Sequence, residues 1–157
     1  MKIEDFEGTS PAFRPEVFFT RALEGWGVLE GPTGALQKRF TVRAEGHIDG
    51  DVIRFRETWI FDDGHTDTLN WEIRAYGNGR YVGREDRSDG EAEGELAGSA
   101  FHWTYTRDTP QPDGKSVKLN FDDWFFQIDD DVVIAKGVGG RLGLPFASAH
   151  VTYRTLA

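Results

Sequence analysis

One acidic residue occupies a position where the surrounding pattern places apolar side chains. Glu57 alternates in phase with Phe55 and Trp59, so its side chain is expected on the same strand face as theirs. Burying a carboxylate is costly unless it is paired. The functional interpretation is a polar anchor inside an apolar binding cavity. A more common role is structural, as a buried ion pair or a carboxylate that accepts hydrogen bonds from backbone N–H groups, and this alternative stays open.

A second acidic feature is the pair Asp122–Asp123, which lies where the apolar alternation shifts by one residue. The apolar positions before the shift are Val117, Leu119 and Phe121, and those after it are Trp124, Phe126 and Ile128. Such a shift predicts a β-bulge, and one acid of the pair is expected to point inward. The pair could instead bond the N–H groups that a bulge frees. If Asp123 meets Glu57 across the interior, the two could act as a general acid and base.

Aromatic residues are expected to form the walls around these acids. The chain has five Trp and twelve Phe, and each large aromatic side chain needs roughly 150–250 Å² of burial. Any single one is more simply a core residue, but as a set they must dominate the interior. No metal ligand and no cofactor is expected. The residues predicted to contact a ligand are Glu57, Trp59, Trp71, Tyr81, Trp103, Asp123 and Trp124.

Other patterns that carry chemistry are incomplete. Only His65 among the four histidines has a carboxylate at metal-ligand spacing, Asp67, and a third ligand is missing. The absence of Cys excludes thiol nucleophiles and Cys zinc sites. The glycine-rich run 137–141 lacks the Lys-Ser/Thr pair of a P-loop. A net charge of −9 makes nucleic acids and anionic membrane surfaces poor partners.

The elements that must position these residues are strands. Apolar residues recur with a period of two from Leu36 to Tyr153, and the hairpin signals Asp62-Asp63-Gly64 and Gly77-Asn78-Gly79 separate successive runs. We expect about nine or ten antiparallel strands in a meander. Such a meander is expected to close into a lipocalin-like or calycin-like β-barrel, because closure removes its exposed edges.

The expected domain organisation is simple. A single β-barrel domain covers 1–157, with an N-terminal extension at 1–14 and a short helix or turn at 15–24. Gly25 and Gly27 prevent that helix from running far. A barrel of about eight to ten strands is wide enough either to hold one small ligand or to be filled by its own side chains.

A family resemblance rests on several segments between Phe18 and Tyr153. They are Arg39-Phe40, Glu57 to Gly64, Trp71, Tyr81 to Asp86, Gly90 to Gly94, Gly98 to Ala100 and Phe121 to Trp124. Together they resemble a bacterial family known only as domain of unknown function 3833, whose members often carry lipoprotein leaders. The resemblance implies a lipocalin-like barrel and no established activity.

Two positions depart from the pattern of that family. Ser99 stands where the family has Asn, and Leu69 stands where it has an Arg two residues before the strand Trp. If that Arg pairs with the inward Glu in the family, Glu57 here must find another partner or a bound cation.

Three functions fit these observations. The preferred one is a non-enzymatic carrier or sensor that binds a small apolar or amphipathic molecule inside the barrel. The alternatives are an isomerase, cyclase or hydratase that moves protons on a lipid-like substrate, and a filled barrel with a structural or interaction role. No run approaches the ~20 apolar residues of a membrane helix. No signal peptide is visible, so a cytoplasmic location is expected, and the oligomeric state stays open.

Overall fold

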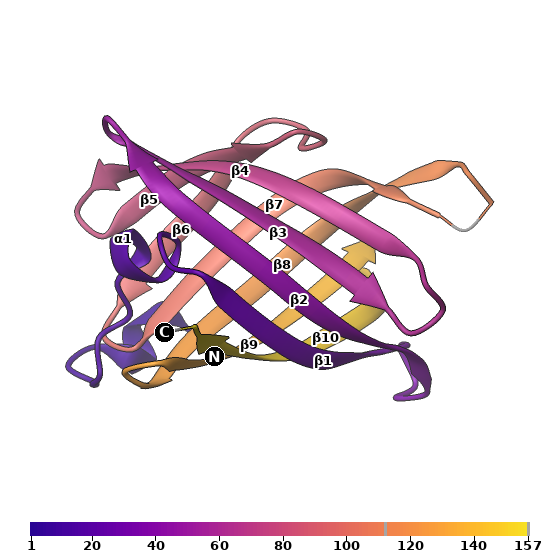
Figure 1. Cartoon of the computed structure of the whole chain (residues 1–157), viewed down its shortest axis with the longest axis horizontal. Helices are drawn as coiled ribbons and strands as arrows, with labels where there is room; N and C mark the ends of the chain where they lie inside the picture. Colours follow the sequence, from indigo (N-terminus) through magenta and orange to yellow (C-terminus); the bar gives the residue numbers. More distant parts are fainter. Residues whose placement is uncertain (112, 157) are drawn as a thin grey trace.

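Ten antiparallel strands form a closed barrel in the computed structural model, which describes residues 1–111 and 113–156 (Figure 1). Each strand pairs with its neighbours in the chain, and the first and last strands pair with each other to close the wall. The predicted antiparallel meander closing into a barrel is confirmed. The strands are β1 (Leu23–Glu30), β2 (Leu36–Asp49), β3 (Val52–Phe61), β4 (Thr66–Gly77), β5 (Arg80–Glu85), β6 (Ala92–Ala97), β7 (Ala100–Pro110), β8 (Ser116–Asp129), β9 (Val132–Arg141) and β10 (Leu144–Thr155).

The helices are minor elements. They are the 3-10 helix η1 (Ile3–Phe6) and the α-helix α1 (Pro15–Phe18), each of four residues. Of the helix or turn expected at 15–24, only Pro15–Phe18 is helical, and β1 already begins at Leu23. Within the described ranges, no helix is long and apolar enough to cross a membrane.

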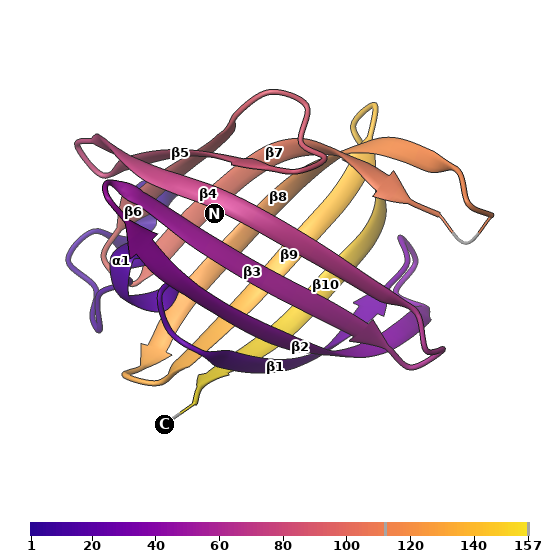
Figure 2. The same cartoon turned by 45° about the horizontal axis from the view of Figure 1, so that its top comes forward.

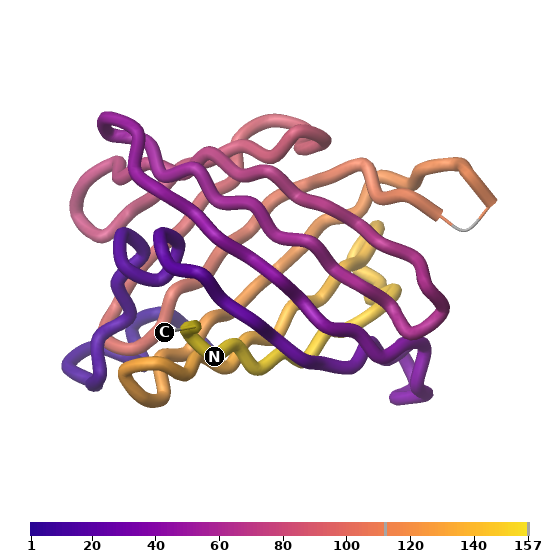
Figure 3. The backbone as a smooth tube through the Cα atoms, viewed as in Figure 1, coloured from indigo at the N-terminus to yellow at the C-terminus, as the bar shows by residue number. Residues whose placement is uncertain are grey.

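One end of the barrel is covered and the other is rimmed by hairpin loops. Figures 1 and 2 show α1 and the chain before it lying across one end. The connections β1–β2, β3–β4 and β9–β10 lie at the opposite end (Figure 3). Three buried side chains, Phe13, Phe18 and Phe19, form an aromatic plug at the covered end. Phe13 stacks on Phe101 with ring centroids 5.5 Å apart, and Phe19 meets Phe55 edge-on at 5.0 Å.

The strand β1 has glycines where other strands carry inward side chains. Gly25 and Gly27 lie between the inward Leu23 and Leu29. A Cβ at Gly27 would lie only 2.6 Å from Cζ of Phe40, so the missing side chain leaves the space that this ring occupies. These glycines therefore allow close approach inside a strand, which is one of the recurrent uses of Gly there. Because glycines stand at these two inward positions, β1 shows no apolar alternation in the sequence, and the period-two pattern starts only at Leu36.

The predicted bulge at Asp122–Asp123 is wrong. Strand β8 pairs with β7 in one unbroken register from Ala100↔Phe126 to Pro110↔Ser116, and its only shift against β9 falls at Gln127/Asp129. Asp123 keeps the inward phase of its strand. The outward face becomes apolar there because η1 covers it: Trp124 and Phe126 pack against Phe6 with ring centroids 5.9 and 5.5 Å away.

Candidate functional site

A cavity of about 460 Å³ occupies the half of the barrel away from the plug. This volume lies within the usual range of small-ligand sites. Most of the wall is apolar, and acids, phenols and an arginine are set into it. Its principal lining side chains are Leu29, Glu57, Trp59, Phe61, Leu69, Tyr105, Arg107, Leu119, Phe121, Asp123, Phe125, Ala149, Val151 and Tyr153.

Glu57 reaches this cavity from the middle of β3. Its register neighbours are Ala44 on β2 and Leu69 on β4, neither of which can pair with a carboxylate. Among the described residues no ion pair joins Glu57 to a basic side chain, and the indole N–H groups of Trp59 and Trp71 lie beside its carboxyl group. Burial raises the pKa of Glu57 to about 7, partly opposed by the nearby indole N–H of Trp59 and the charge of Arg107.

Trp59 lines the same wall and brings a polar atom with it. Its indole Nε1 is buried and has no hydrogen-bond partner among the described residues, even though it lies near enough to Glu57 to lower the pKa of that carboxyl. Buried indole N–H groups normally find a partner. The indole N–H groups of Trp59 and Trp71, which both lower the pKa of Glu57, are therefore donors beside this carboxyl group, and the N–H of Trp59 lacks a well-aligned hydrogen bond.

Asp123 enters the cavity from β8. Its carboxylate accepts a hydrogen bond from the hydroxyl of Tyr105 at 3.0 Å. Its register partner on β9 is Gly137, where a Cβ would lie 2.5 Å from Asp123 Oδ1, so this glycine provides the space for the carboxyl group. Burial, together with the charges of Glu57 and Asp122, raises the pKa of Asp123 to about 8, although the Tyr105 hydrogen bond acts to lower it.

Two phenols complete the polar part of the cavity. Burial, with the charges of Asp123 and Glu57, holds the pKa values of Tyr105 and Tyr153 well above their ordinary value. Both therefore stay neutral hydroxyls. Glu57, Asp123 and Tyr105 each shift the pKa of at least one other group, and the pKa of Tyr153 responds to both acids, so the four share one electrostatic environment.

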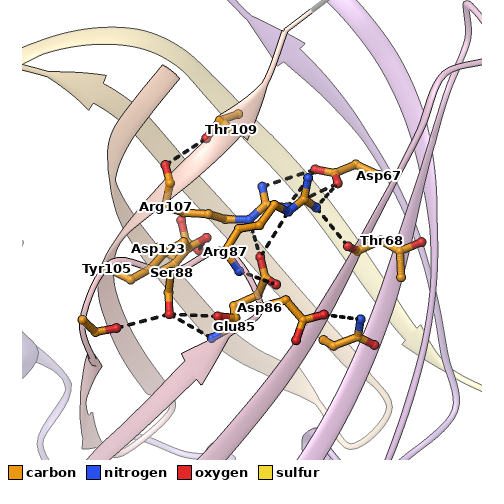
Figure 4. Close-up of polar contacts among 12 residues, drawn as sticks. Asp67, Thr68, Glu85, Asp86, Arg87, Ser88, Tyr105, Arg107, Thr109 and Asp123 are labelled. Carbon is orange, nitrogen blue, oxygen red and sulfur yellow. Dashed lines mark hydrogen bonds and ion pairs between the residues drawn. The ribbon is translucent and has the colours of Figure 1, made fainter. Parts of the chain in front are cut away.

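The cavity wall also contains a paired ionic network (Figure 4). Arg107 donates from Nε to the fully buried carboxylate of Glu85, and its Nη2 donates to Asp67 Oδ2 at 3.2 Å. Arg87 donates to the other oxygen of Asp67 at 2.6 Å and to the carbonyl of Thr68 at 3.2 Å. Two guanidinium groups thus balance two carboxylates. Neither guanidinium is free to neutralise Glu57 or Asp123 by direct contact.

The sequence interpretation missed this network, although a signal for it exists. Arg107 continues the inward phase of Trp103 and Tyr105, just as Asp67 is in phase with Leu69. The partner Glu85 falls in the inward phase of β5. Charged residues at inward positions of three strands therefore indicated a buried ion network.

Polar side chains also lie at the open end of the barrel. Lys38 on β2 lies near the mouth, where its Nζ contacts Asp63 at 3.1 Å and sits 4.7 Å from the centroid of the Phe61 ring. Lys38 lies in the inward phase of β2 with Phe40. His65 and Thr66 line the same rim.

The structure separates the seven residues predicted to contact a ligand into three groups. Glu57, Trp59 and Asp123 line the cavity. Trp71 and Trp103 are buried in the core beside it, and the Trp71 ring packs on the Tyr105 ring with centroids 4.9 Å apart. The remaining two lie elsewhere: Tyr81 bonds Glu16 at the covered end, and Trp124 lies on the outer face stacked on His102.

The expectation that Trp124 forms an inner wall is therefore wrong. It follows Asp123 directly on β8, and consecutive strand residues face opposite sides. His65 and Asp67, which have metal-ligand spacing in the sequence, both line the cavity. No group of three or more potential metal ligands occurs within residues 1–111 and 113–156.

Comparison with known proteins gives a family and no assigned activity. No curated protein matches the chain. A family model described as a protein of unknown function, DUF3833, matches residues 1–154 of the 157-residue chain. This match covers nearly the whole barrel and includes Glu57, Asp123 and their surroundings. The chain therefore belongs to the DUF3833 family.

Proposed function

We propose that this barrel binds a small apolar or amphipathic molecule in its open-ended cavity and acts as a carrier or sensor. The observation that carries the proposal is a cavity of about 460 Å³ whose apolar wall contains two buried acids, Glu57 and Asp123. Apolar walls with a few converging polar groups are the usual composition of small-molecule sites. A barrel filled by its own side chains is disfavoured by the same volume.

The polar groups define how a ligand would be oriented. Its apolar body would contact aromatic and aliphatic side chains such as Phe121, Phe125 and Val151. This contact would stabilise the complex, because it removes apolar surface from water. Its polar group would lie at Glu57, Asp123 and the indole N–H of Trp59.

Binding of a neutral fluorescent probe tests the proposal. N-phenyl-1-naphthylamine brightens in apolar sites and is expected to bind one site per chain. Ala149 faces the cavity, whereas its neighbour His150 points outward and is half exposed. Ala149→Phe is expected to weaken binding at least about tenfold, or ~1.4 kcal/mol, and His150→Phe is expected to leave it unchanged. No probe binding to the wild-type protein, or equal effects of the two variants, would contradict the proposal.

One observation favours a second function, proton-transfer catalysis on a lipid-like substrate. Glu57 and Asp123 have pKa values raised to about 7 and about 8 in one cavity, close to the pH at which a general acid and base work best. An isomerase, cyclase or hydratase would exchange substrate C–H protons with solvent. Incubation of the protein with candidate lipids in D₂O, followed by mass spectrometry, should then show deuterium incorporation that Glu57→Gln abolishes. If no deuterium is incorporated, proton-transfer catalysis is contradicted and only the binding function stands.

A further inference from the structure

The interior of the barrel carries more acid than base. Arg87 and Arg107 are balanced by Asp67 and Glu85 within the network described above. Glu57 and Asp123 face the cavity with no cation in direct contact in the described part of the chain. The basic side chain at the rim, Lys38, is paired with Asp63. A bound cation is therefore the group that would complete the charge balance of the cavity.

The walls around these acids suit a cation with an apolar body. Tyr105 and Phe121 stack with ring centroids 5.0 Å apart beside Asp123, and Trp59 packs at 4.4 Å from the Phe40 ring beside Glu57. Aromatic faces attract ammonium groups, most strongly where water is excluded. Carboxylates among aromatic rings are thus complementary to an alkylammonium ion.

We propose, building on the proposed function, that the cavity selects an amphipathic amine whose protonated nitrogen is received by the carboxyl groups of Glu57 and Asp123. Its hydrocarbon part lies against the apolar wall formed by residues such as Phe125 and Val151. The ammonium group supplies the positive charge that neither arginine of the network can offer.

Other amphipathic ligands fit the same cavity less well. The carboxylate of a fatty acid would face two acids and would require both to be protonated. A neutral alcohol can bond one carboxyl group but cannot offset its charge. Among ligands with one hydrocarbon chain, the amine is therefore expected to bind most tightly whenever Glu57 or Asp123 is ionised.

This selectivity depends on pH in a defined direction. The amine binds the ionised carboxylates, whose fraction rises with pH through pKa values of about 7 and about 8. An alkylamine keeps its proton throughout, because its pKa resembles that of Lys. Affinity for the amine should therefore rise at least about tenfold from about pH 6 to about pH 8.5, with release of protons on binding. The other titratable or charged groups around these acids are Tyr105, Arg107, Tyr153 and Asp67, with Lys38 and His65 at the rim. Asp122 and Lys136 also lie beside the cavity, Asp122 on the outward face of β8 and Lys136 at an exposed position of β9.

The test compares decylamine, decan-1-ol and decanoic acid, each below its micelle concentration. Isothermal titration calorimetry at about pH 8, in two buffers of different ionisation enthalpy, measures affinity and the protons released. The variant Glu57→Gln/Asp123→Asn removes both charges while keeping the shapes of the side chains. Asp122→Asn is the control, because it removes the neighbouring charge on the outward face of β8, where Asp122 contacts His102. The charge of Asp122 raises the pKa of Asp123, so its removal leaves Asp123 more ionised and the amine site intact.

The expected result is binding of the amine at least about tenfold tighter than the alcohol, with proton release. The double variant should lose this preference and Asp122→Asn should keep it. Equal or tighter binding of the alcohol by the wild-type protein would overturn the amine assignment and leave the proposed function standing. No binding of any of the three, with no binding of the neutral probe, would overturn both. The wild-type comparison decides the assignment even if a variant fails to fold.

Discussion

Replacing Glu57 by Gln is expected to stabilise the protein by an amount that grows with pH. The folded-state pKa of Glu57 is raised from 4.5 to about 7 by burial. The native state therefore holds this proton more tightly than the unfolded chain does. Its stabilising contribution is complete below about pH 4.5 and is lost as the pH rises through about 7. Gln does not titrate, so the variant escapes that loss.

The size of the effect follows from the same pKa values. At about 1.36 kcal/mol per pKa unit, the rise from 4.5 to about 7 corresponds to about 3 kcal/mol. Water that enters the cavity solvates the ionised carboxylate and reduces this penalty. We therefore expect the free energy of unfolding of Glu57→Gln, relative to wild type, to increase by about 1–3 kcal/mol between about pH 5 and about pH 8.

Urea unfolding followed by Trp fluorescence across this pH range measures the difference. Glu45→Gln is the matched control, because Glu45 follows Ala44, the register neighbour of Glu57, and faces solvent. Its pH dependence should match that of the wild type. A difference between Glu57→Gln and wild type that stays constant from about pH 5 to about pH 8 would refute the placement of Glu57 in a desolvated cavity.

Three further changes probe the network, the site and the plug. Arg107→Met is expected to cost about 3–5 kcal/mol in urea unfolding, because it removes the closer of the two guanidinium groups beside the buried Glu85 and leaves only Arg87, whose Nε is 4.0 Å away; a loss below about 1 kcal/mol would contradict this role. Gly137→Ala puts a Cβ 2.5 Å from Asp123 Oδ1, so calorimetry should show ligand affinity reduced about tenfold, and an unchanged affinity would argue against Asp123 as an anchor. Phe13→Ala removes a fully buried ring of the plug and should cost about 3–5 kcal/mol; thermal unfolding at an unchanged temperature would show that the covered end is not closed by this ring.

The barrel could be predicted from sequence because each of its hairpins is specified by residues that are close together in the chain. Period-two alternation and turn residues specify each hairpin independently, and the turn at Gly64, with φ 86°, and that at Asn78, with φ 54°, lie where the sequence predicts them. In a meander, hairpins alone determine the topology. The inward direction of Glu57 follows from the same alternation. Asp123 was identified only as one of a pair at an expected bulge, and its inward direction follows from the unbroken register of β8 against β7.

Features that depend on contacts between distant segments were not predicted. Trp124 was misplaced because η1, more than a hundred residues earlier in the chain, covers the outer face of β8. With both faces apolar, alternation no longer tells inside from outside. The cavity itself depends on how the plug of Phe13, Phe18 and Phe19 fills only one end, which no local pattern reveals.

The arrangement around Asp123 and Glu57 favours a binding role over a structural one. A buried acid that serves the fold is normally paired, as Glu85 is with Arg107. Within the described residues neither Glu57 nor Asp123 contacts a cation. Glu57 has apolar register neighbours and indole N–H groups beside it. Asp123 accepts a hydrogen bond from Tyr105 and is accommodated by a glycine at position 137, inside a strand where Gly weakens the sheet. Both positions thus lower stability to keep an acid at the cavity wall. A ligand that neutralises these acids would recover that stability on binding, so an amine that binds should also raise the melting temperature, more at about pH 8 than at about pH 6.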